Sequence, residues 1–332
     1  MVLFRCVYCL QNKPAGDFNI EHVTPKAFGA YQNNLTLHEN QVCKQCNDVF
    51  SKELESEIAE DSFEALLRIT NDIKKFSPGH SIQDTRIKLT GQDGVLKGLD
   101  FEVIADSTTA EKIQLIPYPT IGIRISENPI EYKYFKPDDF PCRTEEIVDQ
   151  LSGKTNSILY WSMDKEYAVM LLKNKGYLIT SHKNLGFKEL YDGEMLNIKI
   201  DLIMDKILNR LIAKTAFNYL VFNEHREYAL LSKFDPIRNF IRFGIDHESI
   251  IVKHTQGKVK NIEVKDGSHI IGLVWGDQYR RCIFGLVSWF NESTHIICLT
   301  DNNENIARTL PMSVFDNLSK TIYTSKQDYV LR

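Results

Sequence analysis

Two Cys-x-x-Cys pairs near the N-terminus limit what the first fifty residues can fold into. Cys6 and Cys9 form one pair, and Cys43 and Cys46 form the other. Each pair can present two thiolates to one metal ion, and four thiolates suit a tetrahedral structural zinc site without an open position. A zinc ion that joins the pairs would stabilise a segment too small to bury a core of its own. The pairs therefore predict a zinc-stapled module.

The composition fits a globular chain in a reducing compartment. Of the 332 residues, 43% are hydrophobic and 25% are charged, which is ordinary for such proteins. The longest uncharged apolar runs, such as residues 283–290, are far too short to cross a bilayer, and the N-terminus lacks a secretory pattern. Cys142, Cys282 and Cys298 are scattered, so we interpret them as plain thiols. We expect a cytoplasmic protein without a membrane partner.

The charge balance argues against binding of nucleic acid by bulk attraction. The formal net charge is −4, and residues 1–60 contain five Lys and Arg against eight Asp and Glu. A polyanion would be poorly held by this segment alone. If a polyanion is the partner, the rest of the chain or a bound metal has to supply the positive charge.

Secondary-structure patterns divide the chain near residue 76. Residues 1–47 are broken by Pro and Gly into loops and short strands, and from Asp48 apolar residues recur at helical spacing. Asp48 or Ser51 could cap this helix, and Asp61-Ser62 could interrupt it. The segment FSPGH, residues 76–80, combines Pro and Gly and is the best boundary.

The remaining chain combines strands with one clear helix. Strand patterns are found in RIKLT, FEVIA, KIQLIPYPTIGIRI and YAVMLLKNKGYLIT between residues 81 and 200, and they return from about residue 228. Residues 201–222 form the clearest helix. We therefore expect an α+β fold with two domains, a zinc-stapled module with following helices at 1–76 and a larger, strand-rich α+β domain at 81–332.

The loop between the cysteine pairs contains an acid next to an imidazole. In IEHVTPKAFG, residues 20–29, Glu21 precedes His22, and Asn47 follows Cys46 directly. Glu21-His22 alone would be interpreted as a surface ion pair, and a zinc ribbon has no need for it. A zinc ion at Cys46 would also fix Asn47 against any part of the loop that folds back over the helix start.

The order Cys-x-x-Cys, acid-His-x-x-Pro, Gly and Cys-x-x-Cys-Asn resembles the zinc-stapled branch of the HNH endonucleases, the ββα-metal nucleases. The resemblance covers residues 6 to about 57. The remaining chain resembles the long C-terminal regions of uncharacterised bacterial HNH proteins, chiefly in KTAFNYL and FDPIRNFIRFG, and this second resemblance implies no activity.

The family resemblance implies hydrolysis of DNA phosphodiester bonds by named residues. His22 would be the general base, since a neutral imidazole titrates near working pH. Adjacent strand residues point to opposite faces, so Glu21 would reach a metal rather than the attacking water. Asn47 would add a neutral oxygen, and a hard ion such as Mg²⁺ or Mn²⁺ would keep most of its waters.

The resemblance also implies a central Asn in the second strand, which holds the catalytic His by a hydrogen bond. Asn34 and Asn40 both compete for this role, and His38 occupies an alternative position. We favour Asn40 because it leads directly into the second cysteine pair.

Basic residues that could contact phosphates fall into two groups. The first lies near the motif and consists of Lys26, Lys44 and Lys52. The second lies farther along the chain and consists of Lys206, Arg210, Lys214, Arg238 and Arg242. A solvated surface position is the favoured interpretation for each group, because lysines are mostly exposed and a helix needs a polar outer face.

Two functions stay open. The first is a metal-dependent HNH endonuclease that acts on DNA. The resemblance implies that one module nicks one strand, hence a homodimer for double-strand cutting, and family analogy suggests restriction or antiphage defence, with a possible activating ligand or partner protein. The alternative is a zinc-ribbon nucleic-acid-binding or regulatory protein whose HNH-like loop does not cut. The joint presence of Glu21, His22 and Asn47 favours the enzyme.

Overall fold

The computed structural model describes residues 2–73, 80–82, 86–105, 113–127, 129–150, 157–177, 181–184, 196–224, 226–259, 262–275, 281–302 and 312–325. The chain forms two compact units: Met1–Lys75 together with Met204–Arg332, and Phe76–Ile203. The expected division into 1–76 and 81–332 is therefore corrected. One hydrophobic core combines residues of the N-terminal module with residues of the last third of the chain, so these two segments fold as one body. Of the expected boundary at 76–80, only His80 lies within the described residues.

The N-terminal module begins with two small antiparallel ladders. Its first elements are β1 (Leu3–Arg5), β2 (Asn12–Pro14), η1 (Ala15–Asp17), β3 (Phe18–Asn19), η2 (Lys26–Phe28) and β4 (Val42–Cys43). Strand β1 pairs with β2, and β3 pairs with β4. The β3–β4 ladder brings the loop with Glu21 and His22 next to the second cysteine pair.

A long helical segment follows the second cysteine pair. It consists of α1 (Lys44–Phe50), the π-helical turn η3 (Ser51–Glu55) and α2 (Ser56–Glu60). The helix begins at Lys44, earlier than the expected start at Asp48 or Ser51, because Cys43 already occupies the N-cap position. The predicted break at Asp61-Ser62 is confirmed. There Ser62 Oγ accepts a hydrogen bond from the amide of Ala65 (3.0 Å) and caps α3 (Phe63–Thr70).

A six-stranded antiparallel sheet makes up most of the last third of the chain. Its order is β14-β17-β16-β15-β18-β19. The strands are β14 (Val252–Gln256), β15 (His269–Trp275), β16 (Ile283–Trp289), β17 (Ser293–Thr300), β18 (Met312–Asp316) and β19 (Thr321–Ser325). Their patterns agree with the strands expected beyond residue 228.

The predicted prominent helix is α7 (Lys206–Asn223). It begins later than expected, because residues 198–202 form a strand and Asp205 caps the helix by accepting a hydrogen bond from the amide of Leu208 (2.8 Å). The short helices α8 (Arg226–Ala229) and η5 (Ser232–Phe234) follow, and then α9 (Asp235–Phe243), which ends at Gly244 with a φ of 67°. Helix α9 buries Ile237, Phe240 and Ile241 on one face.

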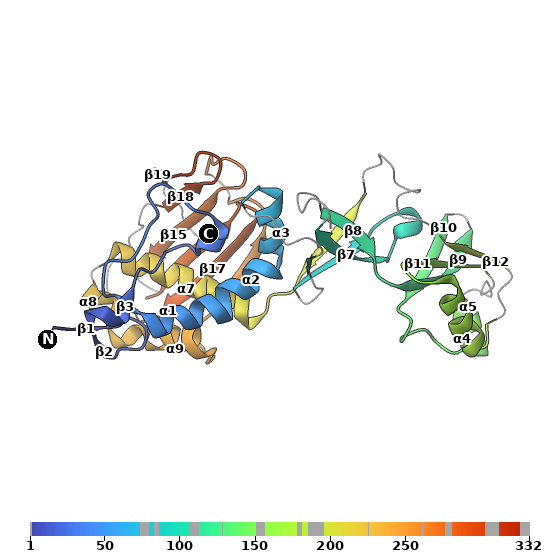
Figure 1. Ribbon diagram of the computed structural model, residues 1–332, viewed down its shortest axis with the longest axis horizontal. Coiled ribbons are helices and arrows are strands. Elements are labelled where there is room, and N and C mark those ends of the chain that lie inside the picture. The colour runs from blue at the N-terminus through green and yellow to red at the C-terminus, as the bar shows by residue number, and fades with distance from the viewer. Residues whose placement is uncertain are drawn as a thin grey trace. The chain divides into compact units, whose positions relative to one another are not determined.

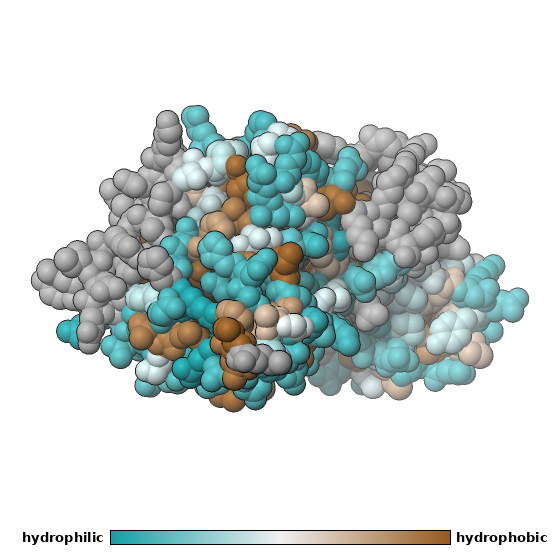
Figure 2. Space-filling model, turned by 60° about the vertical axis from the view of Figure 1, so that its left-hand side comes forward, coloured by the Kyte–Doolittle hydropathy of each residue, from teal (hydrophilic) through white to brown (hydrophobic). Residues whose placement is uncertain are grey.

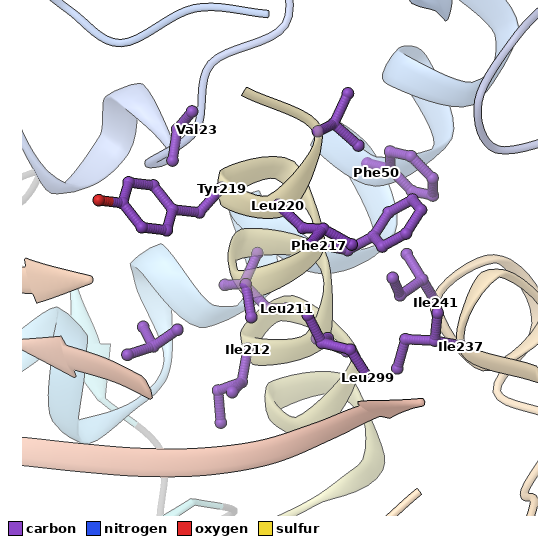
Figure 3. Packing of buried hydrophobic residues seen from close by; sticks show 14 of the residues in the cluster. Val23, Phe50, Leu211, Ile212, Phe217, Tyr219, Leu220, Ile237, Ile241 and Leu299 are labelled. Atoms are coloured by element: carbon purple, nitrogen blue, oxygen red, sulfur yellow. The ribbon is translucent and has the colours of Figure 1, made fainter. Parts of the chain in front are cut away.

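Helix α7 is the centre of the first unit. It packs against β15, β16 and β17 on one side and against η3 and α2 on the other (Figure 1). A side chain at Gly285 of β16 would collide with Ala216, so glycine permits this close approach. Figure 3 shows Val23 and Phe50 of the N-terminal module facing Tyr219, Leu220 and Phe217 of α7. This packing joins the loop of Glu21 and His22 to the C-terminal sheet.

The described residues of the second unit form two sheets. One has the order β10-β9-β11-β12, and the other has the order β13-β6-β7-β5, with β8 paired to β7. The elements are β5 (Ser81–Ile82), β6 (Ile87–Gly91), η4 (Gly94–Leu96), β7 (Asp100–Ala105), β8 (Ile113–Pro117), β9 (Thr120–Glu127), β10 (Ile130–Phe135), α4 (Glu145–Gln150), β11 (Ser157–Trp161), α5 (Lys165–Asn174), β12 (Ser181–Asn184) and β13 (Ile198–Leu202).

The segment YAVMLLKNKGYLIT differs from its expected strand. Its first eight residues belong to the helix α5, which Asp164 caps by accepting hydrogen bonds from the amides of Glu166 and Tyr167. Ala168 and Leu172, four residues apart, are the buried positions of this helix. The N-cap and the helical spacing therefore outweigh the strand-like pattern of the segment.

No helix among the described residues is long and apolar enough to cross a bilayer. On the face that Figure 2 brings forward, hydrophobic residues lie in small separate groups among hydrophilic ones.

Candidate active site

The four cysteines of the two pairs come together in one cluster. The Sγ atoms of Cys6 and Cys46 are 4.0 Å apart, those of Cys9 and Cys43 are 3.8 Å apart, and all four lie within 4.8 Å of one another. Four sulfurs at tetrahedral Zn–S distances are about 3.8 Å apart. None of the four forms a disulfide. The donor set and its spacing fit a structural zinc ion.

The backbone around the cysteines supports thiolate ligands. The amide of Leu10 donates to the carbonyl of Cys6 (2.9 Å) and closes the first knuckle, in which Leu10 has a φ of 59°. The amide of Cys43 donates to Cys6 Sγ (3.4 Å) and links the two knuckles. A hydrogen bond to sulfur favours the charged form that binds metal.

Glu21 and His22 lie where the loop runs antiparallel to residues 35–37. The amide of Leu37 donates to the carbonyl of Glu21 (2.9 Å), and the amide of Val23 donates to the carbonyl of Leu35 (2.9 Å). His22 and Thr36 form an isolated bridge instead of a regular strand. Glu21 and His22 both line the same pocket.

The pocket has a volume of about 530 Å³ and collects residues from the loop, the helix after the second cysteine pair and α3. Its lining consists of Ile20, Glu21, His22, Pro25, Lys26, Ala27, Thr36, Asn47, Ser51, Glu55, Ser56, Ala59, Glu60 and Arg68. The acid, the imidazole and the amide that the sequence singled out therefore share one cavity.

The orientation of the Asn47 side chain leaves its oxygen available. Asn47 Nδ2 donates to Asn19 Oδ1 (2.9 Å) and to the carbonyl of Ile20 (3.1 Å). These two acceptors use both N–H groups and determine which end of the amide is nitrogen. Among the described residues Asn47 Oδ1 accepts no hydrogen bond. It is a suitable neutral ligand for a hard cation at the pocket.

The carboxylate of Glu21 is 3% exposed and is contacted by two side chains of α7. Lys214 Nζ donates to Glu21 Oε1, and Asn218 Nδ2 donates to the same oxygen (2.8 Å). Lys214 Nζ also donates to Glu55 Oε1 (2.6 Å). Burial raises the pKa of the Glu21 carboxyl, against the pull of Lys214. Burial lowers the pKa of the Lys214 ammonium, but Glu21 and Glu55 outweigh it and raise that pKa, so Lys214 is charged.

Residues 6–63 match the family model described as HNH endonuclease. This segment is an HNH module. The match includes the four cysteines, Glu21, His22 and Asn47, whereas Lys214 and Asn218 lie outside it. No curated protein and no solved structure gave a significant match to the chain.

The His22 ring of the HNH module is half-buried in the pocket wall. Burial lowers the pKa of its imidazole, and the positive charges of Lys26 and Lys214 lower it further. Glu55 acts in the opposite direction. The ring is therefore neutral at neutral pH, the form that accepts a proton.

The contact expected from Asn40 is made by another asparagine. Asn40 lies in a turn with a left-handed φ of 62°, which asparagine tolerates, and it has no described hydrogen bond to His22. Asn34 Oδ1 instead accepts from the amide of Tyr31 (2.9 Å), and His38 is exposed outside the pocket. The side chain that bonds to the backbone of His22 is Asn218, whose Nδ2 donates to the His22 carbonyl (2.9 Å).

The basic residues of α7 do not form the solvated stripe that the sequence suggested. Lys206 is exposed and pairs with Asp246 (2.7 Å). Arg210 donates to the carbonyls of residues 241 and 242 (3.0 and 2.9 Å), and Lys214 is fully buried. These contacts join α7 to α9 and to the HNH module, which sequence spacing along one helix does not reveal.

Two other arginines of that group have structural contacts. Arg238 is 2% exposed and donates to the carbonyls of Ala229 (2.7 Å) and Leu231 (2.9 Å). Arg242 lies over the ring of Phe243, 4.3 Å from its centre. The structure thus places Arg238 in the core rather than on a nucleic-acid surface.

Two basic side chains line the pocket of the HNH module, one that the sequence suggested and one that it did not. Lys26 lines the pocket, whereas Lys44 and Lys52 are exposed and do not. Arg68 of α3 also lines it, is 3% exposed and donates from Nη1 to the carbonyl of Ala59. Arg68 reads as an ordinary polar position of a helix, so no signal in the sequence identified it.

Proposed function

We propose that this protein is a metal-dependent endonuclease that hydrolyses DNA phosphodiester bonds at the pocket of its HNH module. The observation that carries the proposal is the convergence of Glu21, His22 and Asn47 on one cavity, within the segment that matches the HNH endonuclease family. The cysteine cluster supports it, because a structural zinc ion would fix Asn47 next to the loop.

His22 acts as the general base in this proposal. Its neutral ring accepts a proton from the water that attacks phosphorus, and its lowered pKa keeps it in the accepting form. Glu21 and Asn47 hold a divalent cation, Mg²⁺ or Mn²⁺, which when bound stabilises the charge that develops on the phosphate and the leaving oxygen. Lys26 and Arg68 line the pocket and offset the charge of phosphates next to the cut.

The wider setting of the activity is also part of the proposal. The HNH module by itself is acidic, so we infer that DNA is held with the help of other parts of the protein or a second copy. One module nicks one strand, and double-strand cutting would use a homodimer. A cytoplasmic role in restriction or antiphage defence, with an activating ligand or partner protein, rests on analogy with the family.

A second function is favoured by one contact. Glu21 is almost fully buried and paired with Lys214, as in a site that holds its carboxylate for structure. A zinc-ribbon nucleic-acid-binding or regulatory protein whose loop does not cut would be compatible with that ion pair.

The test compares cleavage of plasmid, single-stranded and branched DNA by the native chain with Mg²⁺, with Mn²⁺ and with neither, alongside a gel-shift measurement of binding. The endonuclease predicts products that depend on the cation and are lost in His22→Ala of equal zinc content. Binding without cleavage of any DNA form would instead support the alternative function.

A further inference from the structure

Lys214 connects two carboxylates of the pocket, and only one of them was identified from the sequence. Its ammonium donates to Glu21 Oε1 and to Glu55 Oε1, the latter at a distance of 2.6 Å. Glu55 belongs to the π-helical turn η3, lines the pocket and has a side chain that is 20% exposed. The inference below rests on the proposed function and concerns the cation of that same site.

Each carboxylate has one oxygen that is bonded and one that is not. Lys214 and Asn218 both contact Oε1 of Glu21, and Lys214 contacts Oε1 of Glu55. Within the described part of the chain, no hydrogen bond reaches Oε2 of either residue. An almost fully buried carboxylate that lines a polar pocket with an unbonded oxygen is suited to bind a cation there.

The buried ammonium of Lys214 favours a second carboxylate next to Glu21. Lys214 is fully buried and neutralises the charge of Glu21, so a site built from Glu21 and Asn47 alone would have no net charge to attract a divalent cation. Glu55 restores one negative charge. Glu60, Arg68 and Lys26 also line the pocket. A site with Glu55 attracts the cation and, once occupied, also attracts a phosphodiester.

The π-helical turn places Glu55 near Asn47. The two residues are on one continuous helical segment, eight positions apart. A regular α-helix turns about 100° per residue, so residues eight apart would differ in direction by about 80°. The wider π turn rotates less per residue and brings Glu55 back toward the face of Asn47, and such turns are frequent at functional sites.

We propose that Glu55 is a third protein ligand of the catalytic divalent cation, together with Glu21 and Asn47. Its Oε2 faces the cation while its Oε1 is held by Lys214. The HNH module thus supplies all three ligands, and α7 supplies the ammonium that aligns two of them.

The experiment is calorimetric titration of Mn²⁺ into the zinc-loaded full chain in the absence of DNA. We expect Glu55→Gln to raise the Kd by about tenfold or more, with unchanged zinc content. Glu53→Gln is the matched control, because Glu53 lies on the same turn, is 55% exposed and is outside the pocket. Its Kd should stay within about twofold of the native value.

Further variants separate the possible failures. If Glu21→Gln weakens Mn²⁺ binding and Glu55→Gln does not, the inference is overturned and the proposed function stands. If the native chain has no saturable Mn²⁺ site, both the ligand role of Glu55 and the proposed metal-dependent function are contradicted. Glu55→Asp covers the case in which the Gln variant does not fold. It keeps the negative charge next to Lys214, but its shorter side chain moves the carboxylate oxygen away from the cation. Weaker Mn²⁺ binding by the Asp variant supports direct ligation, and native-like binding overturns it.

Discussion

Asn218 and His22 are 196 residues apart in the sequence, yet the Asn218 side chain donates a hydrogen bond of 2.9 Å to the His22 carbonyl. The same nitrogen donates a hydrogen bond of 2.8 Å to the Glu21 carboxylate. Helix α7, far along the chain, thus holds both the acid and the imidazole of the HNH module. The module and the last third of the chain are therefore expected to depend on each other for folding and activity.

Replacement of Asn218 tests this dependence. In Asn218→Leu the Glu21 oxygen and the His22 carbonyl each lose a buried donor, which we expect to lower the free energy of unfolding by about 1–3 kcal/mol. We expect kcat for DNA cleavage to fall more than this loss of folded protein explains, because His22 shifts. Urea unfolding and steady-state cleavage measure the two effects. A native kcat in the folded variant would show that Asn218 does not position the site.

Lys214→Met tests the buried ion pairs. The variant leaves Glu21 and Glu55 without their shared cation, and we expect a loss of about 3–5 kcal/mol in the free energy of unfolding at pH 7. The loss should shrink as the pH falls, because protonated carboxyls no longer need a partner and burial already raises the pKa of Glu21. Unfolding curves from pH 4 to pH 8 measure this trend. An equal loss at every pH would contradict it. Lys206→Met, at an exposed position of the same helix, is the control.

Zinc removal tests the cysteine cluster. Cys43→Ser takes one sulfur from the four, and we expect loss of bound zinc and unfolding of the HNH module. Native mass spectrometry and limited proteolysis within residues 1–75 measure both. Cys142→Ser, which changes an exposed thiol outside the cluster, should retain one zinc ion and the native proteolysis pattern. Zinc retention by the Cys43 variant would show that the cluster is not the binding site.

The pH profile tests the protonation state of His22. The general base has to be neutral, so kcat/KM should rise with pH through the pKa of His22 and then level off. Burial and the nearby Lys26 and Lys214 lower this pKa, which places the acidic limb below the ordinary histidine value of about 6.5. Cleavage rates between pH 4.5 and pH 8 locate the limb. A midpoint above that value would contradict the assignment.

Local sequence signals predicted the zinc-binding pairs and the break at Asp61-Ser62, and similar signals mark the ends of α9. Each of these depends on neighbours in the chain: paired cysteines, a serine cap, or a proline and a glycine around an apolar stripe. The same kind of signal was misleading in YAVMLLKNKGYLIT, where a strand pattern was found and the capped helix α5 forms.

Contacts between residues far apart in the chain could not be predicted from the sequence. Residues 211–221 of α7 are all buried, so its polar residues are enclosed by other elements and cannot be sorted by helical spacing. The sequence therefore suggested a solvated side chain for Lys214, and it favoured Asn40 for a contact with His22 that Asn218 makes. For the same reason the last third of the chain was assigned to a separate domain, although its core is continuous with that of the HNH module.

The central claim is that the pocket of the HNH module cuts DNA with His22 as the base. The most direct measurement is nicking of supercoiled plasmid in Mg²⁺ or Mn²⁺ by His22→Ala, compared with His38→Ala at equal zinc content. His38 is an exposed histidine of the same module outside the pocket. The account predicts that His38→Ala cuts like the native chain and that His22→Ala is slower by a factor of about 10² or more. Equal nicking by the two variants would contradict it.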